Sequence, residues 1–408
     1  MKIIWTLMIL VSGFQRSWAS PERLISTQSP SAKIIRIPFR YVQSFIILDV
    51  KLAHVLPIQL IFDTGSEHTI LFEKKWTDLI VNSYLREIKV IGSDLRDEIP
   101  ALVTAPLELR FGNEYQLQSN LIVLKENTTM ITQIIGEPVH GILSASAFSG
   151  YRIEIDYRRQ QILLHPSNAR IPSSFKTVDL MVQKNKPYLK MMVKHRDGEA
   201  KAMNLLLDTG AGLSALLYLD SLQMRSLPKG LLPGFLGNGL GGILTGYVGK
   251  LQSIRLDTFL ILNPITHFLR IETVIGKNES QVKNGLIGNH ILERFNLIFD
   301  YRQEKLYIKA RKDYRKPESF DKSGMLIIAG GPDLHDYFIA QVIPGTPADL
   351  AGLQEQDEII SINGVPADFY SLSAVQAKLH RKEGKKIRMK IRRNGEKRAY
   401  VFYLKTLI

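Results

Sequence analysis

The sequence carries one short pattern twice, an apolar run that leads directly into Asp-Thr-Gly. The first copy is Asp63-Thr64-Gly65 and the second is Asp208-Thr209-Gly210. Apolar runs of this length are typical of buried strands, so each copy predicts a strand that ends in a carboxylate and a tight turn. One copy alone is consistent with an Asp that only bonds its own turn. Two copies behind matching strands indicate a repeated unit.

Two further landmarks recur at almost the same offset. The two Asp residues are 145 positions apart. An offset of 144 positions separates the segments that begin at Gly141 and Gly285. The same offset separates the Asp-Tyr-Arg segments at Asp156 and Asp300. An offset of this size is a domain's length and not the short period of a solenoid. The chain is therefore predicted to contain two duplicated, mainly β lobes, residues 33–170 and residues 171–316.

Together these motifs resemble the retropepsin-like aspartic peptidases. In that family each lobe contributes one Asp-Thr/Ser-Gly loop, and a later apolar-apolar-Gly segment passes beside it. Leu286-Ile287-Gly288 matches the later segment, whereas Ile142-Leu143-Ser144 departs from it by carrying Ser in place of Gly. The resemblance implies a mainly β chain of two retropepsin-like lobes.

The resemblance also implies a chemistry. Asp63 and Asp208 would form a dyad that shares one proton and activates a water molecule for peptide-bond hydrolysis. Gly65 and Gly210 would let the two loops approach closely, and the hydroxyls of Thr64 and Thr209 would bond the opposite loop. Neither a metal nor another cofactor is expected.

A glycine-rich run in the second repeat, residues 239–247, resembles the flap hairpin of the family. Gly241, Gly242 and Tyr247 are its candidate substrate-facing residues, although Tyr247 fits a packing role equally well. At the matching offset the first repeat has an acidic segment, residues 94–98, which predicts no such hairpin there.

Residues 317–408 resemble a PDZ domain. They contain Pro344-Gly345-Thr346-Pro347-Ala348, then Ala351-Gly352-Leu353, and later Asn363-Gly364. Ser323-Gly324-Met325-Leu326 stands where the family has its Gly-Leu-Gly-Phe carboxylate loop, so a preference for free C-termini stays open.

The resemblance implies a peptide groove between that loop's strand and a helix expected over residues 371–381. The groove residues it implies are Gly324, Met325, Leu326, Ile327, Leu372 and Val375. Leu372 and Val375 also fit a core-facing helical stripe. We expect the groove to add a peptide as an extra strand and to recruit substrate or a partner to the dyad.

The N-terminus is predicted to be a secretory signal, residues 1–19, with cleavage near Ala19 and a polar linker over residues 20–32. Lys2, a short apolar core and small residues before Ala19 fit this pattern. An uncleaved anchor is the alternative. Export to the periplasm or the extracellular space is therefore the expected localisation.

Composition excludes several other functions. The chain has no cysteine, so disulfides, thiol catalysis and cysteine-bound zinc are ruled out. The formal charge of +14 is interpreted as a solvated basic surface, and nucleic acid is not an expected partner. Residues 386–392 alternate strictly between charged and apolar side chains, which is typical of a half-buried strand. Contact of its charged face with an acidic partner or an anionic surface is the alternative.

The prediction is therefore an exported aspartic endopeptidase with a C-terminal PDZ domain. Two alternatives remain open at this point. One is a peptide-binding scaffold that no longer cuts, favoured by Ser144 and by the missing glycine-rich flap of the first repeat. The other is a peptidase active only as a homodimer that pairs two copies of Asp208. The oligomeric state is left open.

Overall fold

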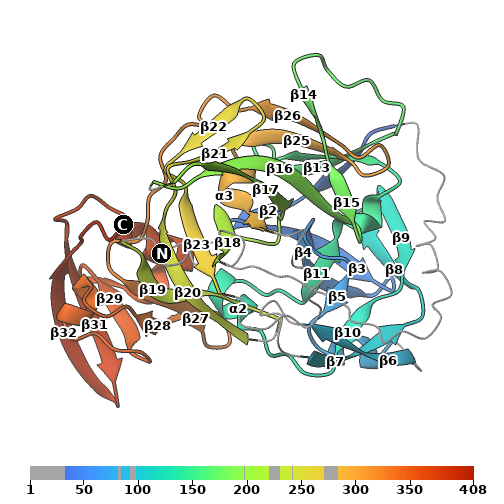
Figure 1. The fold of residues 1–408 in the computed structure, drawn as a ribbon. Coiled ribbons are helices and arrows are strands. Elements are labelled where there is room, and N and C mark those ends of the chain that lie inside the picture. The colour runs from blue at the N-terminus through green and yellow to red at the C-terminus, as the bar shows by residue number, and fades with distance from the viewer. Residues whose placement is uncertain are drawn as a thin grey trace.

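The described part of the chain consists of two sheet-built lobes and a C-terminal domain (Figure 1). The computed structural model describes residues 33–80, 84–91, 98–196, 198–219, 230–240, 242–270 and 284–408. The expected signal peptide and the linker over residues 20–32 lie outside these ranges. Of the helices within them, none is long and apolar enough to cross a membrane.

The two lobes are built on sheets with the same strand order, so the duplication predicted from the sequence is confirmed. Lobe one has the order β6-β7-β10-β5-β11-β4-β3-β8-β9, and lobe two repeats it as β19-β20-β23-β18-β24-β17-β16-β21-β22. The strands of lobe one, in chain order, are β2 (Arg40–Val42), β3 (Phe45–Leu52), β4 (Leu56–Asp63), β5 (Ile70–Leu71), β6 (Tyr84–Ile91), β7 (Glu98–Thr104), β8 (Leu107–Phe111), β9 (Tyr115–Ser119), β10 (Ile122–Leu124) and β11 (Gly141–Ser144). Those of lobe two are β15 (Met181–Gln183), β16 (Lys186–Lys194), β17 (Ala200–Leu207), β18 (Ala215–Tyr218), β19 (Leu232–Gly239), β20 (Gly242–Lys250), β21 (Ser253–Leu256), β22 (Phe259–Leu262), β23 (Ile265–Leu269) and β24 (Gly285–Ile287).

A third sheet joins the lobes, because each repeat contributes its final strands to it. Its order is β1 (Ile35–Pro38), β13 (Gln161–His165), β12 (Arg152–Asp156), β25 (Phe295–Asp300), β26 (Lys305–Ala310) and β14 (Lys176–Asp179). A nearly buried ion pair crosses the junction, with Arg152 Nε 2.6 Å from Asp300 Oδ2. One apolar core runs through both lobes and includes Phe62 and Leu207, the residues just before the two Asp residues. The short helices α1 (Lys75–Asp78), α2 (Ile131–Ile135) and α3 (Asn289–Leu292) lie outside the sheets.

The C-terminal domain has a sheet and a core of its own. Its elements are β27 (Met325–Gly330), β28 (Asp336–Val342), α4 (Pro347–Leu350), β29 (Glu358–Ile362), β30 (Val365–Pro366), α5 (Leu372–Leu379), β31 (Lys386–Arg393) and β32 (Glu396–Tyr403). The helix expected over residues 371–381 is α5, and Ser371 caps it by accepting a hydrogen bond from the N–H of Ala374.

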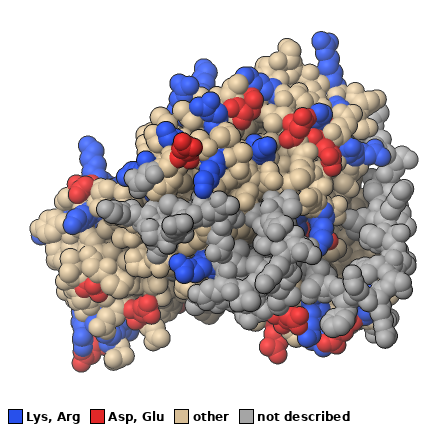
Figure 2. Space-filling view, viewed as in Figure 1, with Lys and Arg blue, Asp and Glu red and all other residues tan. Residues whose placement is uncertain are grey.

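The alternating basic segment is β31, which buries Ile387, Met389 and Ile391 and exposes the charges between them. Arg392 and Arg393 pair with Glu358 and Asp357. On the face drawn in Figure 2 the Lys and Arg side chains are interspersed with Asp and Glu and form no single patch. Both observations favour the interpretation of a solvated surface.

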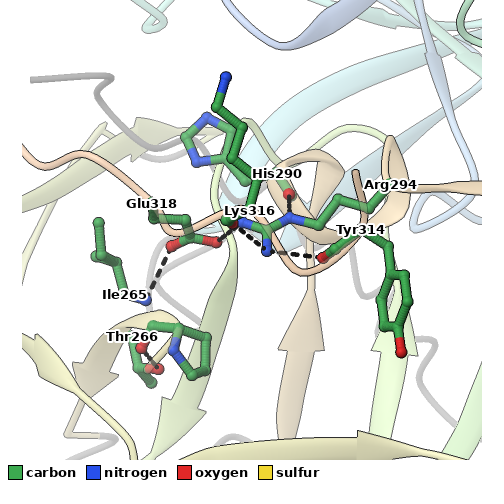
Figure 3. Close-up of polar contacts among 8 residues, drawn as sticks. Ile265, Thr266, His290, Arg294, Tyr314, Lys316 and Glu318 are labelled. Atoms are coloured by element: carbon green, nitrogen blue, oxygen red, sulfur yellow. Dashed lines mark hydrogen bonds and ion pairs between the residues drawn. The ribbon is translucent and has the colours of Figure 1, made fainter. Parts of the chain in front are cut away.

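The segment that leads from lobe two into the C-terminal domain is fastened to lobe two (Figure 3). Glu318 accepts hydrogen bonds from Arg294 Nη2 at 2.5 Å and from the N–H of Ile265 at 2.9 Å. Arg294 also donates to the carbonyl oxygens of Tyr314 and Lys316. A truncation that preserves lobe two therefore has to keep Glu318.

Candidate active site

The two Asp-Thr-Gly loops meet at the junction of the lobes. Strand β4 ends at Asp63 and β17 ends one residue before Asp208, and each strand pairs in parallel with the later strand of its own lobe, β11 or β24. Both Asp side chains are completely buried. Both strands lie inside their sheets, and the residues just before each Asp are apolar and buried, so the strand ends are held from both sides.

Glycine is required on each loop because the opposite carboxylate fills the space where a side chain would begin. A Cβ built on Gly65 would lie 2.6 Å from Asp208 Cγ, and one built on Gly210 would lie 2.4 Å from Asp63 Cγ. No real Cβ comes so close to another heavy atom. The structure thus brings together Asp63 and Asp208 and places each glycine as the sequence predicts.

Thr64 and Thr209 join the two loops by reciprocal hydrogen bonds. Thr64 Oγ1 donates to the carbonyl of Leu207 at 2.6 Å, and Thr209 Oγ1 donates to that of Phe62 at 2.9 Å. Each hydroxyl also accepts from the N–H of the other threonine, at 3.0 Å in both cases. These four buried bonds fix the separation and orientation of the two carboxylates.

Burial and proximity set the charge state of the pair. The N–H of Gly65 donates to Asp63 Oδ1 at 2.6 Å, and the N–H of Gly210 donates to Asp208 Oδ1 at 2.8 Å. Burial nevertheless raises the pKa of Asp63 to about 6. Burial, followed by the charge of Asp63, raises the pKa of Asp208 well above its usual range. Two such carboxylates titrate as a unit, and one proton stays on the pair over a wide pH range.

Lys186 is a charged neighbour that the sequence analysis did not single out. It is the first residue of β16 and is almost completely buried, and its positive charge lowers the pKa of both Asp63 and Asp208. The first residue of the equivalent strand β3 is Phe45. The sequence signal was weak, because β16 also contains the lysines Lys190 and Lys194.

Asn289 is a second missed residue, and it ties the lobes together behind the dyad. It follows Gly288, is completely buried, and its Nδ2 donates to the carbonyl oxygens of Thr209 at 2.6 Å and Ser44 at 2.8 Å. Its Oδ1 accepts from Tyr157 of lobe one at 2.6 Å. Its position beside the apolar-apolar-Gly segment was the only sequence signal.

Ser144, which departs from the family pattern, is accommodated by hydrogen bonds. Its Oγ donates to the carbonyl of Ser66 at 2.7 Å, and its N–H donates to Thr69 Oγ1 at 3.2 Å. At the equivalent position of lobe two, a Cβ on Gly288 would lie 2.4 Å from the carbonyl oxygen of Leu213. Ser144 therefore does not disrupt the first Asp loop.

Both lobes carry a hairpin at the flap position, so the prediction that lobe one lacks one is wrong. Strands β6 and β7 pair antiparallel from Tyr84↔Thr104 to Ile91↔Glu98. The pairing of these two strands, with a register shift between Tyr84 and Arg86, forms this hairpin without a glycine-rich sequence. In lobe two β19 and β20 form the expected hairpin, in which Gly242 opens β20 and Gly241 lies outside the described residues. Tyr247 is half-buried against the main core, opposite Pro233 and Phe268, as the packing alternative supposed.

The predicted groove residues of the C-terminal domain divide into two groups. Met325, Ile327, Leu372 and Val375 belong to the domain's own core, whereas Leu326 packs into a cluster shared with lobe one. Gly324 has a φ of +81° and its backbone lies against Thr346.

A comparison with protein-family models identifies the C-terminal domain. The family model "PDZ domain" matches residues 338–393. This domain is a PDZ domain. A curated protein, "Probable 26S proteasome regulatory subunit p27" of Saccharomyces cerevisiae, is 29% identical over 125 residues, which are 30% of this chain and 53% of the yeast protein. The chain thus spans about half the length of that relative.

Two solved structures are similar to a larger part of the chain. The aspartic proteinase from Irpex lacteus is 11% identical with a TM-score of 0.41, and the match covers 70% of this chain and 99% of that one. Basic 7S globulin from soybean is 8% identical with a TM-score of 0.40, and the match covers 68% and 95% of the two chains. At these values neither structure assigns an activity to this chain.

Proposed function

We propose that this chain is an aspartic endopeptidase that hydrolyses peptide bonds with an intramolecular dyad of Asp63 and Asp208. The observation that carries the proposal is the pair of buried carboxylates, delivered by two equivalent strands and fixed by reciprocal threonine bonds. Burying two carboxylates side by side is costly for stability. An arrangement that a fold maintains at such a cost is typical of a catalytic site.

The chemistry follows from the shared proton. The ionised carboxylate takes a proton from a water molecule, the resulting hydroxide attacks the peptide carbonyl, and the protonated carboxyl donates to the developing oxyanion. Collapse of the tetrahedral intermediate then breaks the C–N bond. The carboxyl that took the proton of the water gives it to the leaving amine, and the other carboxylate takes back a proton from a hydroxyl of the intermediate, which restores the dyad. The step needs neither a covalent intermediate nor a metal.

Export and substrate recruitment are further parts of the proposal. Export rests on the pattern of residues 1–19 and would place the enzyme in the periplasm or outside the cell. Recruitment of a peptide substrate or partner rests on the PDZ match. The position of Asp208 beside Gly65 of the same chain supports an intramolecular dyad over a homodimer built on Asp208.

Cleavage of a random peptide library by the mature chain tests the proposal. We expect cleavage that a pepstatin-type inhibitor abolishes and that the Asp63→Asn variant lacks. Asp49→Asn is the matched control, because Asp49 is an exposed carboxylate of the same lobe. Peptide binding without cleavage by the wild type would favour the scaffold instead.

A further inference from the structure

Helix α2 of lobe one lies over the groove of the PDZ domain. Gly136, the residue that ends this helix, lies against the helix and the strand that border the groove. A Cβ built on Gly136 would lie 3.0 Å from Leu372 Cβ and 3.7 Å from Ala329 Cβ. Leu372 is the first residue of α5, and Ala329 lies in β27. Figure 1 accordingly shows α2 beside β27. The groove expected to take a peptide is covered by the chain's own helix.

Strand β27 is apolar on both faces, and lobe one covers the second face. Met325, Ile327 and Ala329 point into the core of the PDZ domain. Leu326, together with Ile343 after β28, joins the apolar cluster of lobe one that contains all three buried isoleucines of α2. Such a surface is the apolar complement that a docked helix needs.

The carboxylate loop of the PDZ domain already has its donors occupied. The N–H groups of Ser323 and Gly324 both donate to Asp321 Oδ2, at 3.1 Å and 2.5 Å, and the N–H of Met325 donates to Ser323 Oγ at 3.2 Å. Asp321 is completely buried. An internal carboxylate thus already accepts hydrogen bonds from two N–H groups of this loop, which favours an internal segment over a free C-terminus as ligand.

The hairpin of lobe two meets the same cluster. Leu240, beside the hairpin tip, is completely buried in the cluster of lobe one, which also contains Ile61, two residues before Asp63. A Cβ built on Gly234 of β19 would lie 3.8 Å from Ile343 Cδ1 of the PDZ domain. Docking of the PDZ domain and closure of the hairpin therefore share contacts.

We propose that the PDZ groove is a docking site for α2 of the same chain, and that this docking holds the lobe-two hairpin closed on lobe one. A polypeptide reaches the dyad only when the hairpin lifts, so docking restrains cleavage. A recruited peptide would have to displace α2, which would couple recruitment to opening. The effect on cleavage rests on the proposed function, whereas the docking itself does not.

The first test uses a matched pair of glycines, Gly136→Asn and Gly112→Asn, in full-length Asp63→Asn protein. Both glycines lie in lobe one with left-handed φ values, +73° and +57°, which Asn tolerates. The space beside Gly112 is open, whereas Gly136 faces the groove. We expect Gly136→Asn alone to raise amide exchange of α2 and β27 at least tenfold and to enlarge the radius of gyration. Equal behaviour of the two variants would overturn the docking.

A second pair separates undocking from unfolding of the PDZ domain. Ile343 faces lobe one, whereas Ile339 faces the domain's own core. Ile343→Ala should raise exchange in α2 and leave the unfolding of the PDZ domain unchanged, and Ile339→Ala should destabilise that domain. If Ile343→Ala leaves α2 protected, the docking is wrong.

The effect on cleavage is read in the same docking variants with Asp63 restored. Gly136→Asn and Ile343→Ala should raise kcat/KM on a short peptide several-fold. Unchanged or slower cleavage would overturn the restraint. If amide exchange shows that the variants undock but neither they nor the wild type cleave any peptide, the proposed peptidase function is refuted and the proposed docking stands.

Discussion

Replacing Asp63 with Asn should stabilise the protein while it abolishes cleavage. The folded-state pKa of Asp63 is about 6, against an ordinary value of 3.8. A raised carboxyl pKa means that the fold disfavours the ionised form, so stability is lost as the pH rises from about 4 through about 6. The shift of roughly two units sets an upper limit of about 3 kcal/mol above pH 7, because the two carboxylates titrate as a unit and Asp208 remains in the variant. Asn cannot ionise, and its Oδ1 can keep the bond from the N–H of Gly65.

Urea denaturation at pH 8 and pH 3.5 measures this effect. Trp76 is the one tryptophan outside residues 1–19 and packs against His140 in lobe one, so fluorescence of the mature chain reports on this lobe. Asp63→Asn should raise the free energy of unfolding at pH 8, by up to about 3 kcal/mol, and by almost nothing at pH 3.5. The control Asp49→Asn, which removes an exposed ion pair with Arg40, should change it by less than about 1 kcal/mol. No gain at pH 8, or an equal gain at both pH values, would refute the reasoning.

Three further predictions concern the same site. Gly210→Ala should abolish cleavage, since its Cβ would lie 2.4 Å from Asp63 Cγ, whereas Gly150→Ala, at a position with open space, should cleave normally. Thr209→Val removes two buried hydrogen bonds and should lower the free energy of unfolding by roughly 2–4 kcal/mol, measured by urea denaturation. The kcat/KM should rise through about pH 6 as the pair loses its first proton and fall at higher pH when it loses the second. Because the charge of Lys186 lowers the pKa of both carboxyls, Lys186→Met should move the rising, acidic limb of this profile to higher pH. An unchanged acidic limb would contradict the role given to Lys186.

The duplication and the dyad could be predicted because their signals are local. Each Asp-Thr-Gly loop follows its own apolar strand, and the strand both buries the carboxylate and aims it at the junction. The alternation in β31 likewise specifies a half-buried strand without reference to the rest of the chain. In these cases sequence spacing alone decides the geometry.

The remaining features depend on contacts between segments far apart in the chain. Asn289 reaches Ser44 of lobe one, and Gly136 meets Leu372 of the PDZ domain. No local sequence pattern predicts either contact. The lobe-one hairpin was missed for a different reason, because a search for glycines does not detect a hairpin whose register is set by strand pairing.

Cleavage by the two single dyad variants tests the central claim most directly. The kcat/KM of Asp63→Asn and of Asp208→Asn would be measured separately and after mixing the two proteins in equal amounts. The account predicts that each variant loses at least about a thousandfold and that mixing restores nothing, because both carboxylates must come from one chain. Substantial activity in Asp63→Asn, or recovery on mixing, would contradict the intramolecular dyad and point to a dimer that pairs two chains.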